Sequence, residues 1–271
     1  MSKKKELWTA ILVCLIITNI CWYVGYSMHI KDEGNIAAVI FIYLASFMPA
    51  ITAVVMCKKN KEKVQTLLIN PNIKKSGKIY LIAILTSLFI VYASDLLPLL
   101  FFPNDIALVP ENLTIIFLGK IIVFTFLSTI ESIGLLGEEL GWMGYFFPGL
   151  EKEYGTFPAI FMIAIIRTLW HLAALILMGG VVWFSVLNLF VSNFMLQSTL
   201  VYVTKKSNSV FPAAIVHAIT NILVILSFVT YSDEFYNANL IKFNLVQLIP
   251  IIVVGTIYYI LLYKDKKDMN F

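Results

Sequence analysis

Long, uninterrupted apolar runs are the feature of this sequence that most restricts its fold. Each run is about 20 residues long, the length at which an α-helix crosses the ~30 Å hydrocarbon core of a bilayer. Only 13% of the 271 residues are charged and 60% are hydrophobic, so a water-soluble domain of this size would expose a largely apolar surface. Because lipid offers backbone polar groups no partner, the runs are predicted to be helical. The sequence therefore predicts an all-α, polytopic membrane protein.

About eight transmembrane helices are expected, in a single membrane domain over residues 1–271. The N-terminal Met-Ser-Lys-Lys-Lys resembles the start of a signal peptide. However, the apolar run continues to about Met28 with no Ala-x-Ala cleavage site, so the first span is expected to be retained. The predicted spans are 7–28, 36–57, 79–102, 113–137, 157–178, 182–204, 210–230 and 244–263.

Lysines are distributed unevenly among the loops. With eight spans, Lys3–Lys5, the lysines of 58–78, Lys205 and Lys206, and the C-terminal lysines fall on one side of the membrane. The positive-inside rule then places both termini in the cytoplasm, and we expect a bacterial plasma membrane. Membrane lipid is an expected partner. Nucleic acid is not expected, because the lysines behind the net charge of +4 lie in the loops, where their distribution indicates membrane topology. The opposite side carries Asp32, Glu33, Asp105, Glu111, Asp233 and Glu234, with only Lys31 and Lys242.

Ionisable residues inside the predicted spans are few. A charge at the bilayer centre costs about 2.5–3.5 kcal/mol even on the mildest scale. Such groups are therefore expected to face one another or a hydrated cavity, and they mark the place to look for function. They are Asp95, Lys120, Glu131, Glu138, Glu139, Arg167, His171 and His217.

Three short motifs contain most of these groups. Glu138 and Glu139 are adjacent at the end of the fourth span, where repulsion between two carboxylates favours general acid–base work. Arg167, the only arginine in the chain, lies four residues before His171 in the fifth span. It requires a carboxylate partner, for which the two glutamates are candidates. His217 and Asn221 are likewise four residues apart in the seventh span.

Each motif also has a structural interpretation. The glutamates alone are explained by an interfacial helix end, the arginine by an ion pair between helices, and the His–Asn pair by an interhelical hydrogen bond. Their combination on three spans favours a catalytic site. Two chemistries remain open. A zinc ion could be held by Glu138, His171 and His217, with the second glutamate as base. Without metal, a Glu and a His would activate water, while His217 and Asn221 stabilise an oxyanion.

In this order, the motifs resemble those of the CAAX-protease and bacteriocin-processing (CPBP) family of intramembrane proteases, which includes bacterial Abi proteins. The family pattern is Glu-Glu-x-x-x-Arg, Phe-x-x-x-His and His-x-x-x-Asn. The resemblance covers about residues 36–230 as a protease-like core, and it depends most on 137–221. It implies an intramembrane endopeptidase with its site near the cytoplasmic face. By match, Glu138 is the base and Glu139 its helper, His171 shares the catalytic or metal site, and His217 and Asn221 stabilise the oxyanion.

Two positions depart from the family pattern. Met143 stands where the family has Arg, and Arg167 stands where it has Phe. Our hypothesis is that Arg167 supplies the guanidinium that is missing at position 143. The alternative is a catalytically inactive member that acts as a binding or bacteriocin-immunity protein. A small transporter is a weaker third reading, because no paired halves are visible.

The sequence leaves the substrate open among a membrane peptide, a bacteriocin precursor and a lipidated C-terminus. It leaves the oligomeric state and the roles of Asp95, Lys120 and Glu131 unassigned. It also poses a geometric problem. His171 would lie roughly 21 Å into a span that starts at Phe157, whereas Glu138 would lie at a span end. The two meet only if the helices tilt strongly or if 145–158 runs along the interface.

Overall fold

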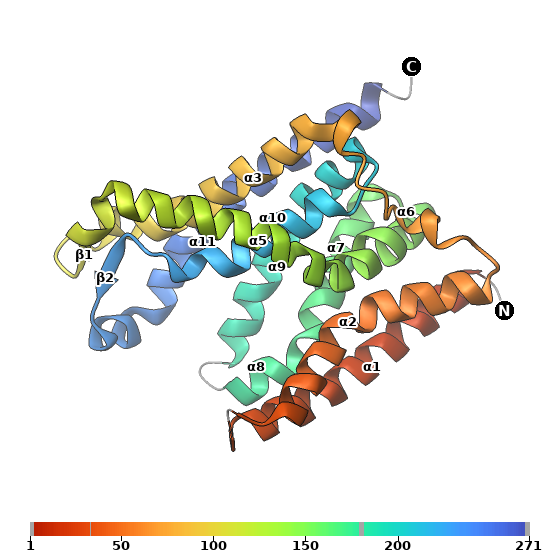
Figure 1. Ribbon diagram of the computed structural model, residues 1–271, viewed down its shortest axis with the longest axis horizontal. Coiled ribbons are helices and arrows are strands. Elements are labelled where there is room, and N and C mark those ends of the chain that lie inside the picture. Colours follow the sequence, from red (N-terminus) through yellow and green to blue (C-terminus); the bar gives the residue numbers. More distant parts are fainter. Residues whose placement is uncertain (1–2, 33, 179–181, 269–271) are drawn as a thin grey trace.

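The computed structural model describes residues 3–32, 34–178 and 182–268, and helices dominate it (Figure 1). The prediction of an all-α membrane protein is confirmed. The first half contains α1 (Lys3–His29), α2 (Ile36–Lys59), η1 (Val64–Leu67), α3 (Ile73–Leu96), α4 (Pro98–Phe101), β1 (Ile106–Leu108), η2 (Pro110–Leu113) and α5 (Ile115–Gly141). The second half contains η3 (Trp142–Phe146), α6 (Phe147–Tyr154), α7 (Thr156–Trp170), α8 (Leu172–Met178), α9 (Val182–Ser207), α10 (Phe211–Ile222), η4 (Leu223–Ile225), β2 (Val229–Tyr231) and α11 (Asp233–Asp268).

Within the described ranges, five helices are long and apolar enough to cross a membrane: α1, α2, α3 with α4, α9 and α11. A sixth candidate is a bent pair, Ile115–Ile130 and Leu135–Tyr154, whose axes differ by 55°. Two shorter apolar helices, α7 and α10, complete the set. Long, bent and short helices together make about eight, in agreement with the sequence.

The boundaries of the spans differ from the prediction where the functional motifs lie. The fourth span does not end at 137, because the helix continues through a π-helical turn, η3, into α6. The hydropathy pattern does not predict this continuation of the helix, because it contains the charged residues Glu151, Lys152 and Glu153. The fifth span is not one helix, because α7 ends at Trp170 and α8 begins at Leu172.

The longer fourth span and the break in the fifth span explain how Glu138 and His171 can lie at a similar depth. Glu138 lies 16 residues before the end of α6 at Tyr154, which is about 24 Å along helical backbone. It is therefore as deep in the bundle as the C-terminal half of α7. Segment 145–158 belongs to the end of this bent helix and the start of α7, so the fourth span is longer than predicted.

One end of the bundle gathers the lysine-rich segments, and we call it the basic end. Lys59 pairs with Glu6 at 3.3 Å, Lys205 with Glu151 at 2.5 Å, and Lys206 with Asp265 at 2.7 Å. These contacts join α1 to α2, α9 to α6, and α9 to α11. The chain termini lie at this end in Figure 1. The predicted grouping of the lysines on one side agrees with these contacts.

The opposite end, which we call the acidic end, contains a short antiparallel sheet. β1 pairs with β2 so that Ile106 faces Tyr231 and Leu108 faces Val229. Asp95 fixes the chain just before β2, because its carboxylate accepts from Ser227 Oγ at 2.6 Å and from the Phe228 backbone N–H at 2.7 Å. Asp95 is thus a structural anchor rather than part of the central cluster.

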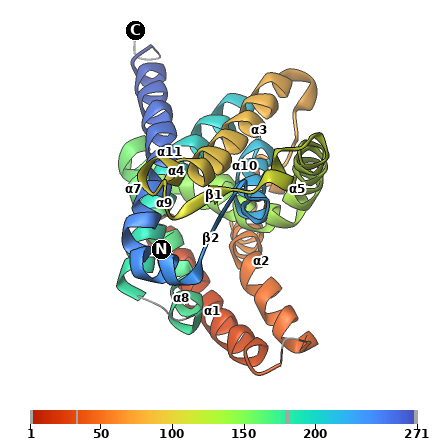
Figure 2. The same cartoon turned by 90° about the vertical axis from the view of Figure 1, so that its left-hand side faces the viewer.

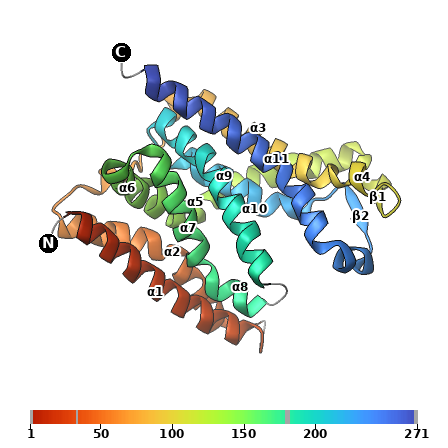
Figure 3. The ribbon, with the colours of Figure 1, turned by 180° about the vertical axis from the view of Figure 1, so that it is seen from behind.

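The core follows the helix pairs. α1 packs against α2, and α8 lies beside α1 (Figure 2), while α9 and α11 run side by side when seen from behind (Figure 3). α5 crosses α2 very closely. A Cβ built on Gly141 would lie within 2.5 Å of the Pro49 carbonyl oxygen, so only glycine fits there. This crossing fixes the segment of α5 that carries the two glutamates.

Candidate active site

Glu138 and Glu139 lie in the last turn of α5, directly before the π-helical turn η3. A π turn inside an α-helix changes the direction of the following side chains, and such turns often mark functional sites. Both carboxylates are buried, with 6% and 0% of the residue exposed. The glutamates therefore sit inside the helix bundle and not at its surface.

Glu139 joins three helices through one oxygen. Its Oε1 accepts from Arg167 Nη1 of α7 at 2.9 Å and lies 2.8 Å from His217 Nδ1 of α10. The arginine and the histidine are themselves buried, at 2% and 7% exposure. The expectation that Arg167 pairs with one of the two glutamates is confirmed, and the partner is Glu139.

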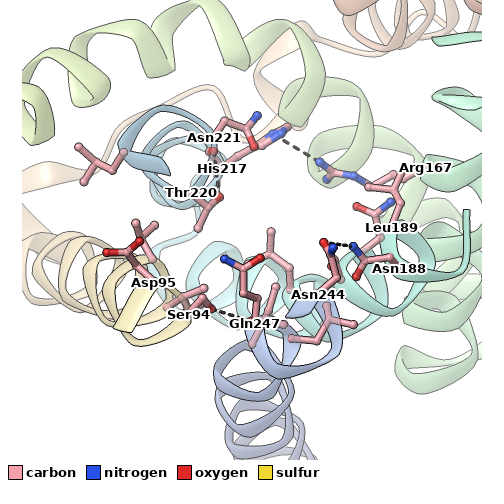
Figure 4. A pocket seen from close by; sticks show the side chains of 18 of the residues that line it. Ser94, Asp95, Arg167, Asn188, Leu189, His217, Thr220, Asn221, Asn244 and Gln247 are labelled. Carbon is pink, nitrogen blue, oxygen red and sulfur yellow. Dashed lines mark hydrogen bonds between the residues drawn. The ribbon is translucent and has the colours of Figure 1, made fainter. Parts of the chain in front are cut away.

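The contacts of His217 fix which ring nitrogen carries a proton. A carboxylate oxygen only accepts, so Nδ1 must donate to Glu139. Arg167 Nη2 lies 3.4 Å from the same Nδ1 (Figure 4). Because Nδ1 already bears a hydrogen, this second approach is a close contact and not a hydrogen bond. Nε2 of His217 is thus the nitrogen left for chemistry.

Aromatic side chains surround the arginine. Its guanidinium lies 5.9 Å from the centroid of the Trp142 ring, and Trp142 meets Trp170 edge-on at 5.9 Å. A delocalised guanidinium stacks on aromatic rings better than an ammonium does. The pocket around Arg167 therefore suits arginine specifically and not any cation.

Glu138 is the most loosely held member of the cluster. Its Oε2 has no hydrogen-bond partner among the described residues, and it lies 3.9 Å from His217 Nδ1. Two carboxylates against one guanidinium leave the cluster with one net negative charge. A single proton, held by Glu138 or by His217, makes the buried cluster neutral. Because the two groups interact closely, they share this proton and titrate as a pair. The arrangement is suited to moving one proton.

His171 occupies the break between α7 and α8. Its Nδ1 lies 2.9 Å from the Arg167 carbonyl oxygen, which only accepts, so Nδ1 donates there. In the neutral ring, Nε2 is then a free acceptor. His171 is half-buried and borders the cavity described below.

Asn19 of α1 is a residue that the sequence analysis missed. Its Nδ2 donates to the Leu169 carbonyl at 3.0 Å and its Oδ1 accepts from the Ala173 backbone N–H at 2.9 Å. These two backbone groups flank His171, where the helical hydrogen bonds are interrupted. Unpaired backbone groups are costly in a membrane, so Asn19 stabilises the break that presents His171. A neutral Asn inside an apolar span was the available signal.

A cavity of about 360 Å³ opens beside the cluster. Arg167, His171, His217 and Asn221 border it, whereas Glu138 and Glu139 are not among its lining residues. The glutamates contact Arg167 and His217, and these two residues border the cavity. Asn221 lies on this rim, and its side chain forms no hydrogen bond within the described part of the chain.

Some predicted members do not join this cluster. Lys120 is exposed near the start of α5 and does not line the cavity, so the expectation that such groups face one another or a hydrated cavity does not hold for it. Its long side chain can reach the membrane surface from there. Asp95 anchors the segment before β2, as described above. The side chain of Glu131 lies outside what the structure describes.

Met143, at the position of the family arginine, is buried in the π turn. Its Sδ accepts from Gln197 Nε2 of α9 at 3.0 Å, and Gln197 Oε1 has no partner among the described residues. An unpaired buried carbonyl oxygen is the group that a guanidinium would satisfy. The surroundings of Met143 thus still contain an acceptor for an arginine.

The predicted zinc ligands are not arranged as a metal site. Among the residues described, no group of three His, Cys, Asp or Glu side chains is arranged to hold a metal ion. The Nδ1 atoms of His171 and His217 are engaged by oxygen atoms, and the Arg167 guanidinium lies next to the His217 ring. The set Glu138, His171 and His217 does not fit a metal in this arrangement.

Comparison with protein families gives one match. The family described as Type II CAAX prenyl endopeptidase Rce1-like matches residues 115–223, and comparison with curated proteins finds no match. The matched stretch runs from α5 to η4 and contains all three motifs. The wider core predicted over 36–230 stays a prediction. The resemblance inferred from the motifs is confirmed: residues 115–223, which carry all three motifs, match the model of this CAAX-protease-type family.

Proposed function

We propose that this protein is an intramembrane endopeptidase that hydrolyses a peptide bond of a membrane-associated peptide or protein. The observation that carries the proposal is the buried Glu139–Arg167–His217 cluster, which three helices bring together at the edge of a cavity lined by both polar and aliphatic side chains. The family match supports protease activity of this general type. A purely structural ion pair would need neither a third helix nor a cavity.

In the mechanism we infer, Glu138 and His171 activate the attacking water. Glu138 has an unpaired carboxylate oxygen, and His171 has a free acceptor at Nε2 on the cavity side. A water between them could transfer its proton as it attacks the carbonyl carbon. The same proton then passes to the leaving amine. Glu138 reaches the cavity only if its side chain moves, which catalytic groups often do on substrate binding.

His217 and Asn221 stabilise the oxyanion in this mechanism. Glu139 holds Nδ1 of His217, so a protonated ring would point its Nε2–H away from Glu139, in the manner of a catalytic triad. The Asn221 amide on the cavity rim is the second donor. Arg167 keeps Glu139 ionised and in place, which makes it a positioning residue.

The orientation of the protein is part of the proposal. The positive-inside rule puts the basic end, with both termini, in the cytoplasm of a bacterial plasma membrane. The cavity lies between the middle of the bundle and the acidic end, because it includes Asp95 near the end of α3. In this orientation the site is farther from the cytoplasmic face than the family resemblance implies.

The test is cleavage of a membrane-peptide library by the purified full chain in nanodiscs, with Glu138→Gln as the inactive comparison. We expect cleavage by the wild type, its loss in the variant, and no effect of a zinc chelator. Inhibition by the chelator, reversed by added zinc, would contradict the metal-free mechanism but not the protease. No cleavage by a folded wild type would favour the binding or immunity alternative.

A further inference from the structure

The wall of the cavity that faces the catalytic cluster carries amide side chains. Asn188 comes from α9, and Asn244 and Gln247 come from α11; we call these three residues the amide wall. In Figure 4, Asn244 and Gln247 lie across the cavity from His217 and Asn221, and Asn188 lies beside Asn244. Two of the three are on α11, outside the family-matched residues 115–223.

The hydrogen bonds of the amide wall are incomplete. Asn188 Nδ2 reaches Asn244 Oδ1 at only 3.5 Å, and Asn188 Oδ1 is buried without a partner among the described residues. Asn244 Nδ2 donates to the Leu240 carbonyl at 2.7 Å. The Gln247 side chain makes no hydrogen bond within the described ranges and points into the cavity (Figure 4). The wall therefore offers both unpaired donors and unpaired acceptors.

The charged side chains that line the cavity already have partners. Arg167 pairs with Glu139, and Asp95 accepts two hydrogen bonds from the segment before β2. What remains is a lining of aliphatic side chains into which neutral amides project. A lipid tail offers the amides no hydrogen bonds, and an anionic headgroup would find no free cation, because Arg167 is paired with Glu139. The complementary ligand is one that is itself built from amides.

A protease acting on membrane-embedded peptides needs such a surface for a physical reason. A peptide bond inside a helix has its N–H and C=O groups paired and its carbonyl shielded. Unwinding exposes these groups, which costs several kcal/mol for each unsatisfied group in lipid. An Asn or Gln side chain can donate and accept at once, so it can replace the hydrogen bonds that unwinding removes.

We propose that the amide wall binds the main chain of an extended, uncharged peptide segment and holds it across the cavity toward His217 and Asn221. This inference rests on the proposed function and adds the substrate class: peptides with an unwound, neutral segment within the membrane. Sequences that stay helical, or that place a charge in this segment, are poor ligands. The role is one of binding, since no proton transfer is assigned to the wall.

The test measures binding without turnover, in the Glu138→Gln background. Two fluorescent membrane peptides are compared in nanodiscs, one an uninterrupted helix and one with a central Gly-Pro break. We expect the broken peptide to bind more tightly. Gln247→Leu and Asn188→Leu should each weaken its binding by roughly 2–12-fold, the value of one lost hydrogen bond. N-methylation of the broken segment should weaken binding similarly, because it removes main-chain donors.

Asn239→Leu is the matched control. Asn239 lies on the same helix α11, but its amide donates to the Phe235 carbonyl at 3.1 Å and it does not line the cavity. Equal binding of the two peptides would overturn the proposal, as would unchanged binding in Gln247→Leu or equal weakening in Asn239→Leu.

The two proposals fail in different ways. Tight, wall-dependent binding with no cleavage by the wild-type protein would contradict the protease and leave the amide wall intact. Cleavage that proceeds with unchanged KM in both wall variants would contradict the amide wall alone.

Discussion

The Arg167 guanidinium on α7 donates to Glu139 on α5 at 2.9 Å, with side-chain exposures of 3% and 0%. A buried pair of this kind gains little over a well-packed apolar pair, but removing one partner leaves an uncompensated charge. Because His217 shares the same carboxylate oxygen, the pair also sets the geometry of a third helix. Glu138 and Glu139 are adjacent in one helix, but only Glu139 holds Arg167 and His217 in place. We therefore predict different effects for substitutions at the two positions.

Glu139→Gln and Glu138→Gln should affect different properties. Glu139→Gln leaves Arg167 without its anion, so we expect the free energy of unfolding in detergent to fall by about 3–5 kcal/mol. Glu138→Gln removes a carboxylate with an unpaired oxygen, so the fold should be nearly unaffected while cleavage falls by roughly 10²–10⁴-fold. Denaturant titration and peptide cleavage on both variants check this. Equal destabilisation of the two would refute the division of roles.

Arg167→Met should abolish cleavage and destabilise the protein, because Glu139 and His217 lose their guanidinium neighbour. The double variant Met143→Arg with Arg167→Met returns the guanidinium to the position that it has in the family pattern. We expect this variant to regain part of the activity. Gln197 Oε1 offers an unpaired acceptor beside position 143. Cleavage rates of the single and double variants measure this. Full activity in Arg167→Met would disprove the hypothesis that the charge has moved.

Asn19→Leu should lower kcat, because the helix break at His171 loses its partners on α1. Asn19→Asp is the sharper variant, since a carboxylate still accepts from Ala173 N–H but cannot donate to the Leu169 carbonyl. We expect both variants to shift the NMR signals of His171 in histidine-labelled protein, which has only three histidines. A loss of activity without any change in the His171 signals would argue against a positioning role.

Gly141→Ala should destabilise the crossing of α5 over α2. The added Cβ would overlap the backbone of Pro49, and overpacking of this kind costs about 1–3 kcal/mol of unfolding free energy. Gly119→Ala is the control in the same helix, because nothing lies within 4 Å of its added Cβ. Thermal unfolding of the two variants compares them. If Gly141→Ala is as stable as Gly119→Ala, the close crossing is not a constraint.

Local sequence patterns sufficed for several features because their causes are local. Apolar runs require helices in lipid, and lysine clusters follow the loops, so the fold class and the basic end could both be predicted. The motif spacing placed Arg167 on the face of His171 and His217 on the face of Asn221. The unique arginine in an apolar span could only be explained by a buried carboxylate, and Glu139 is that carboxylate.

The sequence by itself thus determined that the chain is a helical membrane protein. It also determined which ionisable residues lie within the apolar spans and which family their motifs resemble. The tertiary structure alone decided which glutamate binds Arg167, since adjacent residues differ by only about 100° around a helix and packing selects between them. It also decided that the α5 helix continues through a π turn, that Asn19 bridges the break at His171, and that amides of α9 and α11 face the cluster. These are contacts between residues distant in sequence, and no local pattern encodes them.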